Sequence, residues 1–173
     1  MSYKEEVTKA MQMLAEDERV IFIGQTVLYP GSAIYGTLEG IPPEQKVELP
    51  VAEDMQMGMS IGLSLMGYIP VSVYPRMDFL ILACNQLVNH LDKIEWMSCG
   101  QYKPKVIVRT MVGSTKPLYP GPQHCQDHTA ALKRMMGRVN VVRLLHDRDI
   151  VQSYKFALES SRPTVLVEMA DFY

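Results

Sequence analysis

One acidic side chain, Glu53, stands at the entrance of an apolar helix that the sequence predicts over residues 50–67. Pro50 suits the first turn of a helix, and an acid there complements the helix dipole, which stabilises an exposed end by about 0.3–1 kcal/mol. A carboxyl group beside so much hydrocarbon can also be kept dry, where its hydrogen bond to a buried polar group is strong. The first interpretation needs no ligand, whereas the second makes Glu53 part of a cofactor site.

Two histidines flank a cysteine farther along the chain, at His124, Cys125 and His128. An imidazole titrates near neutral pH and can act as a general acid or base. The spacing of the two histidines would also suit zinc, but no second Cys–His pair completes a tetrahedral set, so we expect no metal here. Asp127 suits the cap of the helix that follows.

The elements that must position these residues alternate between strand-like and helix-like segments. Strands are expected at residues 20–24, near 47, and at 69–73, 106–110, 139–144 and 164–168. Helices are expected at residues 3–17, 50–67, 79–99, 127–136 and 147–160. This alternation predicts βαβ units and a mostly parallel sheet, the α/β class, with ligands beyond the carboxyl ends of the strands. Long loops through residues 29–43 and 113–122 leave that same edge.

Composition excludes several classes of function. A chain of 173 residues suits one domain, and 17 basic against 19 acidic residues give a net charge of −2, without the basic surface that nucleic acid attracts. No apolar run approaches the roughly 18 residues that a spanning helix needs, so we expect no membrane segment. Three cysteines without a CxxC pair, behind a polar start, predict reduced thiols in the cytoplasm.

Segments along nearly the whole chain resemble the pyrimidine-binding domain of thiamine-diphosphate enzymes in the transketolase group. The resemblance is greatest to the β chain of 2-oxoacid dehydrogenases and to deoxyxylulose-phosphate synthase. The segments are residues 50–54 (Pro-Val-Ala-Glu-Asp), 67–70 (Gly-Tyr-Ile-Pro), 77–79 (Met-Asp-Phe), 85–89 (Asn-Gln-Leu-Val-Asn), 109–113 (Arg-Thr-Met-Val-Gly) and 121–124 (Gly-Pro-Gln-His). The resemblance implies a single domain over residues 1–173, with the three-layer α/β/α thiamine-diphosphate-binding fold.

The resemblance also implies roles for individual residues. The family's glutamate, matched by Glu53, hydrogen-bonds N1′ of the cofactor's pyrimidine and favours the imino tautomer, whose 4′ nitrogen removes the thiazolium C2 proton. Phe79 matches the aromatic ring that stacks on the pyrimidine. This segment has one more residue before Phe79 than the synthase pattern, so Tyr74 is a second candidate, and a core position for Phe79 stays open. His124 matches the histidine that faces the substrate and moves protons there.

Two further residues are expected to face the substrate. His128 is a second polar wall of the same site or an exposed side chain. Gln25 stands where the β chains carry the glutamate of a Gly-Glu-Asp loop, and this departure from the pattern implies a different substrate or a different coupling. The implied chemistry makes or breaks a C–C bond next to a carbonyl, by 2-oxoacid decarboxylation or by ketol or acyl transfer.

The family's other half holds the cofactor diphosphate through Mg²⁺ with a Gly-Asp-Gly motif, and that motif is absent from this sequence. The resemblance therefore implies a partner α subunit that supplies the motif and the Mg²⁺ ligands, in an α₂β₂ enzyme active only when assembled. Small residues along the 50–67 helix (Gly58, Ser60, Gly62 and Ser64) suit either a subunit interface or dense packing within the domain.

Two other interpretations belong to different classes. The chain could be a non-catalytic paralogue that keeps the fold and regulates or scaffolds a partner, although a scaffold has no need of Glu53, Phe79 and His124 together. It could also be an unrelated α/β domain of flavodoxin type, but the acid at the helix entrance and the Gly-x-x-His loop fit that class poorly.

Overall fold

Short, mostly apolar runs form the strands of one six-stranded sheet, and the computed structural model describes residues 2–173. The strands are β1 (Val20–Gly24), β2 (Lys46–Glu48), β3 (Ile69–Tyr74), β4 (Ile107–Val112), β5 (Asn140–Arg143) and β6 (Thr164–Met169). Every pairing is parallel, in the order β2-β1-β3-β4-β6-β5. Strands β3, β4 and β6 are almost wholly buried, as strands covered on both faces should be.

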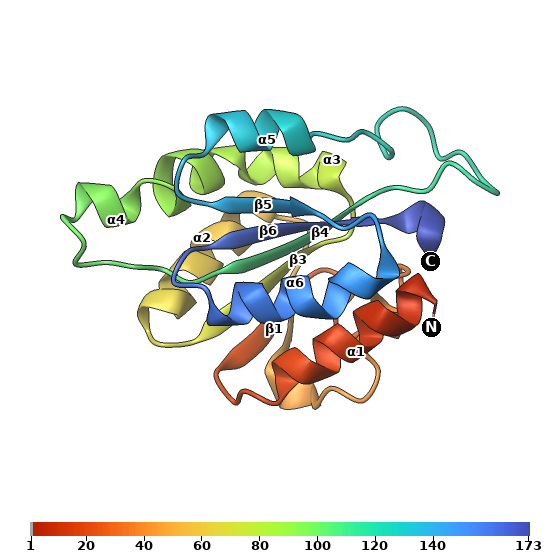
Figure 1. Ribbon diagram of the computed structural model, residues 1–173, viewed down its shortest axis with the longest axis horizontal. Coiled ribbons are helices and arrows are strands. Elements are labelled where there is room, and N and C mark those ends of the chain that lie inside the picture. Colours follow the sequence, from red (N-terminus) through yellow and green to blue (C-terminus); the bar gives the residue numbers. More distant parts are fainter. Residues whose placement is uncertain (1) are drawn as a thin grey trace.

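Helices cover both faces of this sheet (Figure 1). They are α1 (Tyr3–Ala15), α2 (Glu53–Leu65), α3 (Met77–Leu80), α4 (Ile94–Met97), α5 (Thr129–Met135) and α6 (Asp147–Glu159). One apolar cluster joins α1 and α6 to their face of the sheet, and a second cluster joins α2, α3 and α5 to the other face. The expected α/β class with three layers is therefore confirmed.

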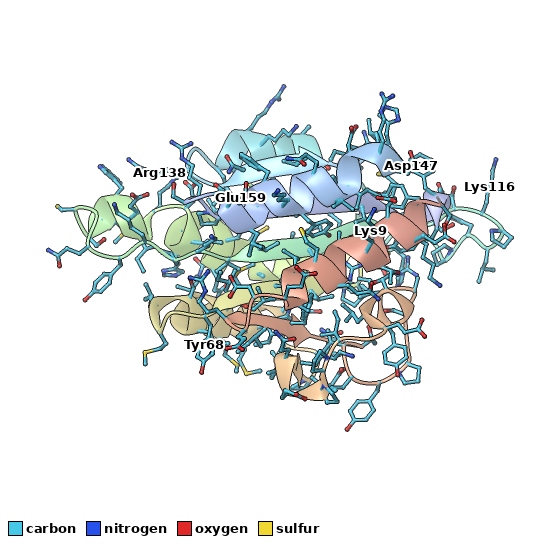
Figure 2. The ribbon with its side chains drawn as sticks, turned by 60° about the horizontal axis from the view of Figure 1, so that its bottom comes forward. Lys9, Tyr68, Lys116, Arg138, Asp147 and Glu159 are labelled. Atoms are coloured by element: carbon cyan, nitrogen blue, oxygen red, sulfur yellow. The ribbon has the colours of Figure 1, made fainter. Side chains whose placement is uncertain are left out.

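The topology places a crevice at one edge of the sheet. The chain runs from β1 to its neighbour β2 and then crosses back over β1 to β3, so the direction of winding changes between β1 and β3. Parallel α/β sheets bind ligands beyond the carboxyl ends of their strands at such a switch point. In Figure 2, Lys116 and Asp147, which follow β4 and β5, mark this carboxyl edge of the sheet. Tyr68, Arg138 and Glu159 lie toward the opposite edge, where the strands begin.

The helix expected over residues 79–99 is present but irregular: residues 77–91 are helical throughout, with a change of helix type along the way, and a turn at residues 92–93 separates them from α4. After α3 it continues as a 3-10 turn (Ile81–Ala83), a π-helical turn (Gln86–Leu91) and then α4. The wide turn accompanies a buried acid: Asp92 is 1% exposed, and its carboxylate accepts hydrogen bonds from the backbone amides of Arg138 and Val139. A tertiary contact of this kind leaves no trace in the apolar periodicity of the segment.

Helix α2 begins at Glu53, later than the expected start near Pro50. Ala52 is the residue before the first turn, and its side chain offers no cap to the helix. Glu53 is therefore the first residue of α2, at the carboxyl edge of the sheet. Among the helices of residues 2–173, none has the length and apolar character needed to cross a membrane.

Candidate functional site

The carboxylate of Glu53 is withdrawn from solvent at the start of α2. The residue is 3% exposed, and its Oε1 accepts a hydrogen bond of 3.2 Å from Nε2 of Gln25. Its second oxygen, Oε2, has no hydrogen-bond partner among residues 2–173. A carboxylate in such a position is held by one neutral donor and retains an acceptor for a second one.

Gln25 reaches Glu53 from the loop that follows β1, and Glu48 holds that loop in place. The Glu48 carboxylate accepts hydrogen bonds from the backbone amides of Thr26, Val27 and Leu28 at 2.6–2.8 Å. Thr26 has a φ of 58°, a left-handed conformation that is unusual for a residue other than glycine. The three amides thus stabilise a turn that directs Gln25 toward Glu53. Glu48 cannot be recognised from the sequence, because its contact depends on the pairing of β1 with β2.

Tyr74 lies beneath Glu53 and is not open to a ligand in this structure. Its ring is 0% exposed, and its hydroxyl donates to the backbone carbonyl of Glu53 at 3.3 Å. Burial raises the pKa of Tyr74 above its usual value, so the hydroxyl stays neutral and available as a donor. Ser72 and Gln56 continue this buried polar network under α2. Tyr74 thus supports the start of α2, which leaves Phe79 as the aromatic candidate for stacking.

A cleft of about 370 Å³ opens at the carboxyl edge of the sheet, and Gln25, Thr26, Arg76 and Phe79 contribute to its wall. Phe79 is partly exposed there. The ring of His124 meets the ring of Phe79 edge to face, with centroids 5.8 Å apart. The structure therefore brings Gln25 to Glu53 and His124 to Phe79, with Gln25 and Phe79 in one cleft.

His128 lies apart from these pairs, just before α5. Its backbone amide donates to Sδ of Met77, and its ring Nε2 is buried without a hydrogen-bond partner among the described residues. Asp127 accepts from the amide of Thr129 and so caps the start of α5. Burial raises the pKa of Asp127, but its hydrogen bonds with Thr129 and the nearby Arg143 outweigh burial and hold the pKa below its ordinary value.

A larger hollow, of about 840 Å³, lies at the opposite edge of the sheet. Residues 16–19, just before β1, contribute to its wall together with the end of α6. It is a more open surface than the cleft, and its acids include Asp17, which is paired with Arg19. We therefore place the site at the smaller cleft, whose wall includes Phe79 and Gln25, the residue that donates to the buried Glu53 carboxylate.

A buried ion pair close to the cleft was also missed at the level of the sequence. Arg109 and Glu168 are both 0% exposed and are joined by two hydrogen bonds, of 2.9 and 3.1 Å. The hydroxyls of Tyr154 and Tyr173 donate to the same carboxylate, and burial together with that negative charge raises the pKa of both tyrosines well above the usual value. The sequence does contain a clue to this ion pair, because β4 and β6 are apolar strands that each carry a single charged residue, Arg109 and Glu168.

The sequence profile of the family described as transketolase, pyrimidine binding domain, matches residues 1–171. The pyruvate dehydrogenase E1 component subunit beta of Rickettsia conorii is 27% identical over all of this chain and 53% of its own length. The 2-oxoisovalerate dehydrogenase subunit beta of Bacillus subtilis is 29% identical over 65% of this chain and 36% of its own length. The chain thus spans about half the length, or less, of these relatives.

Solved structures share the fold at low sequence identity. A split-gene transketolase, described as an inactive beta4 tetramer, has a TM-score of 0.75 at 19% identity, over 98% of this chain and 52% of its own. Transketolase from Campylobacter jejuni has a TM-score of 0.76 at 14% identity, over 96% of this chain and 25% of its own. With the profile match over nearly its whole length, the chain belongs to the transketolase pyrimidine-binding domain family.

Proposed function

We propose that this chain is the pyrimidine-binding (β) subunit of a split thiamine-diphosphate enzyme that makes or breaks a C–C bond next to a carbonyl. The observation that carries the proposal is the buried Glu53 carboxylate with its unpartnered Oε2. Oε2 is not among the fully buried atoms that lack a partner, so a group entering the site can reach it. A ring nitrogen of an aminopyrimidine is a suitable partner, because one proton shared between that nitrogen and the carboxyl group makes a hydrogen bond. The family to which the chain belongs supplies the class of cofactor.

The residues at the cleft fit the aminopyrimidine half of that cofactor. Glu53 would hold the ring nitrogen, and Gln25 keeps the carboxylate oriented for that contact. Phe79, partly exposed in the cleft wall, would stack on the ring. His124, edge to face with Phe79, would exchange protons with the substrate. When bound, the cofactor supplies the carbon nucleophile that adds to the substrate's carbonyl group.

The diphosphate end of the cofactor needs ligands that we assign to another chain. Within residues 2–173, no three His, Cys, Asp or Glu side chains are grouped so that they could hold a metal ion. We propose that a partner α subunit with a Gly-Asp-Gly motif binds the diphosphate and Mg²⁺, in an α₂β₂ assembly in the cytoplasm. The cofactor would then lie between the two chains.

The outer face of α2 supports assembly with another subunit. Gly58 and Gly62 are exposed there, and a Cβ atom at either position would meet nothing within 4 Å. The neighbouring exposed apolar side chains on α2 and the adjoining turn are Met55, Met59, Leu65, Met66, Ile81 and Leu82. The solved split-gene transketolase is described as an inactive beta4 tetramer, which supports the proposal that this chain associates with other chains and is active only with a partner.

The substrate class is proposed from the relatives and from the site together. The curated relatives are β subunits of pyruvate and 2-oxoisovalerate dehydrogenases, and the solved structures are transketolases. The same arrangement of Glu53, Phe79 and His124 serves an oxidoreductase that decarboxylates a 2-oxoacid or a transferase that moves a ketol or acyl group. We therefore propose a 2-oxoacid or a ketose phosphate as the substrate.

The test is Glu53→Gln in the complex with a diphosphate-binding partner chain. The complex should bind thiamine diphosphate with Mg²⁺ in calorimetry and turn over one member of a panel of 2-oxoacids and ketose phosphates. Glu53→Gln keeps the size and the Gln25 contact but removes the acid, so turnover should fall by about 10²–10⁴-fold. The matched control is Asp54→Asn, which removes the neighbouring exposed acid and should leave turnover unchanged.

Two outcomes would overturn the proposal. Equal turnover by the wild type and Glu53→Gln would remove Glu53 from the chemistry. A complex that forms normally but neither binds the cofactor nor turns over any substrate would favour the non-catalytic alternative, a paralogue that keeps the fold and scaffolds its partner.

A further inference from the structure

Arg76 carries a positive charge in the wall of the cleft without a carboxylate to balance it. It lies two residues after the end of β3 and is partly buried. Its Nη1 donates to the backbone carbonyl of His124 at 3.1 Å, and it forms no ion pair with any acid in residues 2–173. The other nitrogens of the guanidinium, Nε and Nη2, have no hydrogen-bond acceptor among these residues. The guanidinium is therefore held through Nη1, while Nε and Nη2 remain free to donate hydrogen bonds.

Three acids near the cleft are held by other donors, and neither Glu53 nor Asp78 forms an ion pair with Arg76; Asp78 accepts from Gln126 instead. Glu48 accepts three backbone amides, and Glu168 is paired with the buried Arg109. Asp171, beside the cleft residue Ala170, accepts hydrogen bonds from Ser114 and Thr115. None of these carboxylates lies within ion-pair distance of Arg76, so its guanidinium can pair with an incoming anion.

Gly113 provides the space in which the guanidinium lies. A Cβ atom at residue 113 would be 2.3 Å from Nη1 of Arg76 and 1.8 Å from the carbonyl oxygen of His124. Both contacts are far shorter than any side chain permits, so only glycine allows Arg76 to dock on this loop. The sequence combines an arginine at the end of one strand with a glycine at the end of the next, and both are needed for the contact.

We propose that Arg76 binds the anionic end of the substrate, either a carboxylate or a phosphate. A guanidinium presents a planar fork of donors that matches both groups. Phe79 shares the cleft with Arg76, so a substrate anchored there would lie beside the residue that we assign to the cofactor. The inference rests on the proposed function for the identity of the neighbouring cofactor, but not for the anion site itself. It makes Arg76 a specificity residue that selects charged carbonyl compounds over neutral ones.

The experiment is a titration of the isotope-labelled full chain, followed by the backbone amide signals of Thr26, Phe79 and Ser114 and by the Arg76 Nε–H signal. The probes are sodium pyruvate, inorganic phosphate and the neutral hydroxyacetone, at constant ionic strength. We expect saturable shifts with at least one anion and none with hydroxyacetone. Saturation by pyruvate alone assigns the site to a carboxylate, and saturation by phosphate alone assigns it to a phosphate end.

Variants separate a specific anion site from a general effect of charge. Arg76→Gln should weaken anion binding at least about tenfold, the loss expected for hydrogen bonds to a charged group. Arg76→Lys keeps the cation and should restore part of the affinity. Lys116→Gln removes one positive charge from an exposed loop near the same edge and should bind as the wild type does (Figure 2).

Three results would overturn the inference: no saturable shift with either anion, unchanged affinity in Arg76→Gln, or equal losses in Arg76→Gln and Lys116→Gln. The titration needs neither the cofactor nor the partner chain. It can therefore fail while the Glu53 test succeeds, and it can succeed while that test fails.

Discussion

At Glu53, a neutral amide determines how a buried acid is held. Nε2 of Gln25 donates to Oε1 at 3.2 Å and leaves Oε2 for another partner. A donor that carries no charge orients the carboxylate without neutralising it, unlike the guanidinium that pairs with Glu168 elsewhere in the sheet. Oε2 of Glu53 therefore stays available to an incoming group.

Replacing Gln25 with leucine should test this orientation. The variant keeps a similar volume but removes the only hydrogen bond that residues 2–173 give to the Glu53 carboxylate, which leaves a buried acceptor unpaired. We expect cofactor affinity in the assembled enzyme to fall by about 1–2 kcal/mol, or roughly tenfold. Calorimetry of the complex measures this loss.

A double-mutant cycle with Glu53→Gln provides the control. If Gln25 acts through Glu53, its replacement should have little further effect once the acid is gone. The same tenfold loss in the Glu53→Gln background would show instead that Gln25 contacts the cofactor or substrate directly.

The sequence predicted individual candidate residues of the site but not the contacts between them. Glu53 was identified from its place at the start of an apolar helix, and Gln25 from its departure from a family pattern. Their contact depends on Glu48, which fixes the loop after β1 through three backbone amides. The sequence also suggested Tyr74 as a residue that contacts the cofactor, but its ring is buried under Glu53 and is not open to a ligand.

At the scale of elements, strands were easier to predict than helices. Buried parallel strands appear as apolar runs bounded by turns, and β1 has the bounds that its sequence predicts. The segment from Met77 to Met97 also appears apolar and periodic, yet its helix is made irregular by a π-helical turn. Such turns are single-residue adjustments that tertiary contacts select, so a periodic pattern does not reveal them.

Asp92, at the end of that turn, links it to the strand β5 beyond. Burial raises the pKa of Asp92, but hydrogen bonds from Lys93 and from the backbone of Arg138 together lower it below its ordinary value. Because the folded-state pKa lies below the unfolded one, the ionised group stabilises the fold above the unfolded pKa. This contribution is lost as the pH falls through the folded-state pKa.

Asp92→Asn should therefore destabilise the chain in a pH-dependent way. The amide cannot pair with Lys93 and is a weaker acceptor for the amides of Arg138 and Val139. We expect the free energy of unfolding to fall by about 1–2 kcal/mol at pH 7. The difference from the wild type should shrink as the pH is lowered from about 5 toward about 3.

Urea unfolding at several pH values measures this difference, with the exposed Asp54→Asn as the control. A gap that stays constant across the pH range would mean that Asp92 acts through packing and not through its charge.

At the scale of the whole molecule, the position of the site follows from topology. Alternating strands and helices predicted a parallel sheet, and the change of winding between β1 and β3 places the crevice beyond their carboxyl ends. Which side chains meet there is decided by loops, whose conformations depend on contacts between distant segments. Arg76 illustrates this, because nothing in the sequence singles it out and its position in the fold requires a glycine at residue 113.

The face of α2 that carries Gly58 and Gly62 is where the molecule is expected to meet another subunit. Because a Cβ at Gly62 meets nothing within 4 Å, Gly62→Ala should stabilise the isolated chain by about 0.5–1 kcal/mol through helix propensity alone. Gly62→Trp should leave the isolated chain folded but weaken assembly with the partner by at least about tenfold, since overpacking a close helix contact costs more than 1 kcal/mol. Sedimentation velocity with and without the partner chain measures both states.

Gln152→Trp is the matched control, because Gln152 is exposed on α6, on the opposite side of the sheet. If both tryptophan variants assemble as the wild type does, α2 is not the interface, and its apolar side chains must be accounted for in another way. If only Gly62→Trp fails to assemble while its unfolding transition matches that of the wild type, Gly62 is retained for a neighbour and not for the domain's own packing. The pairing of a tolerated alanine with a disruptive tryptophan at one position separates these two explanations without a change in the core.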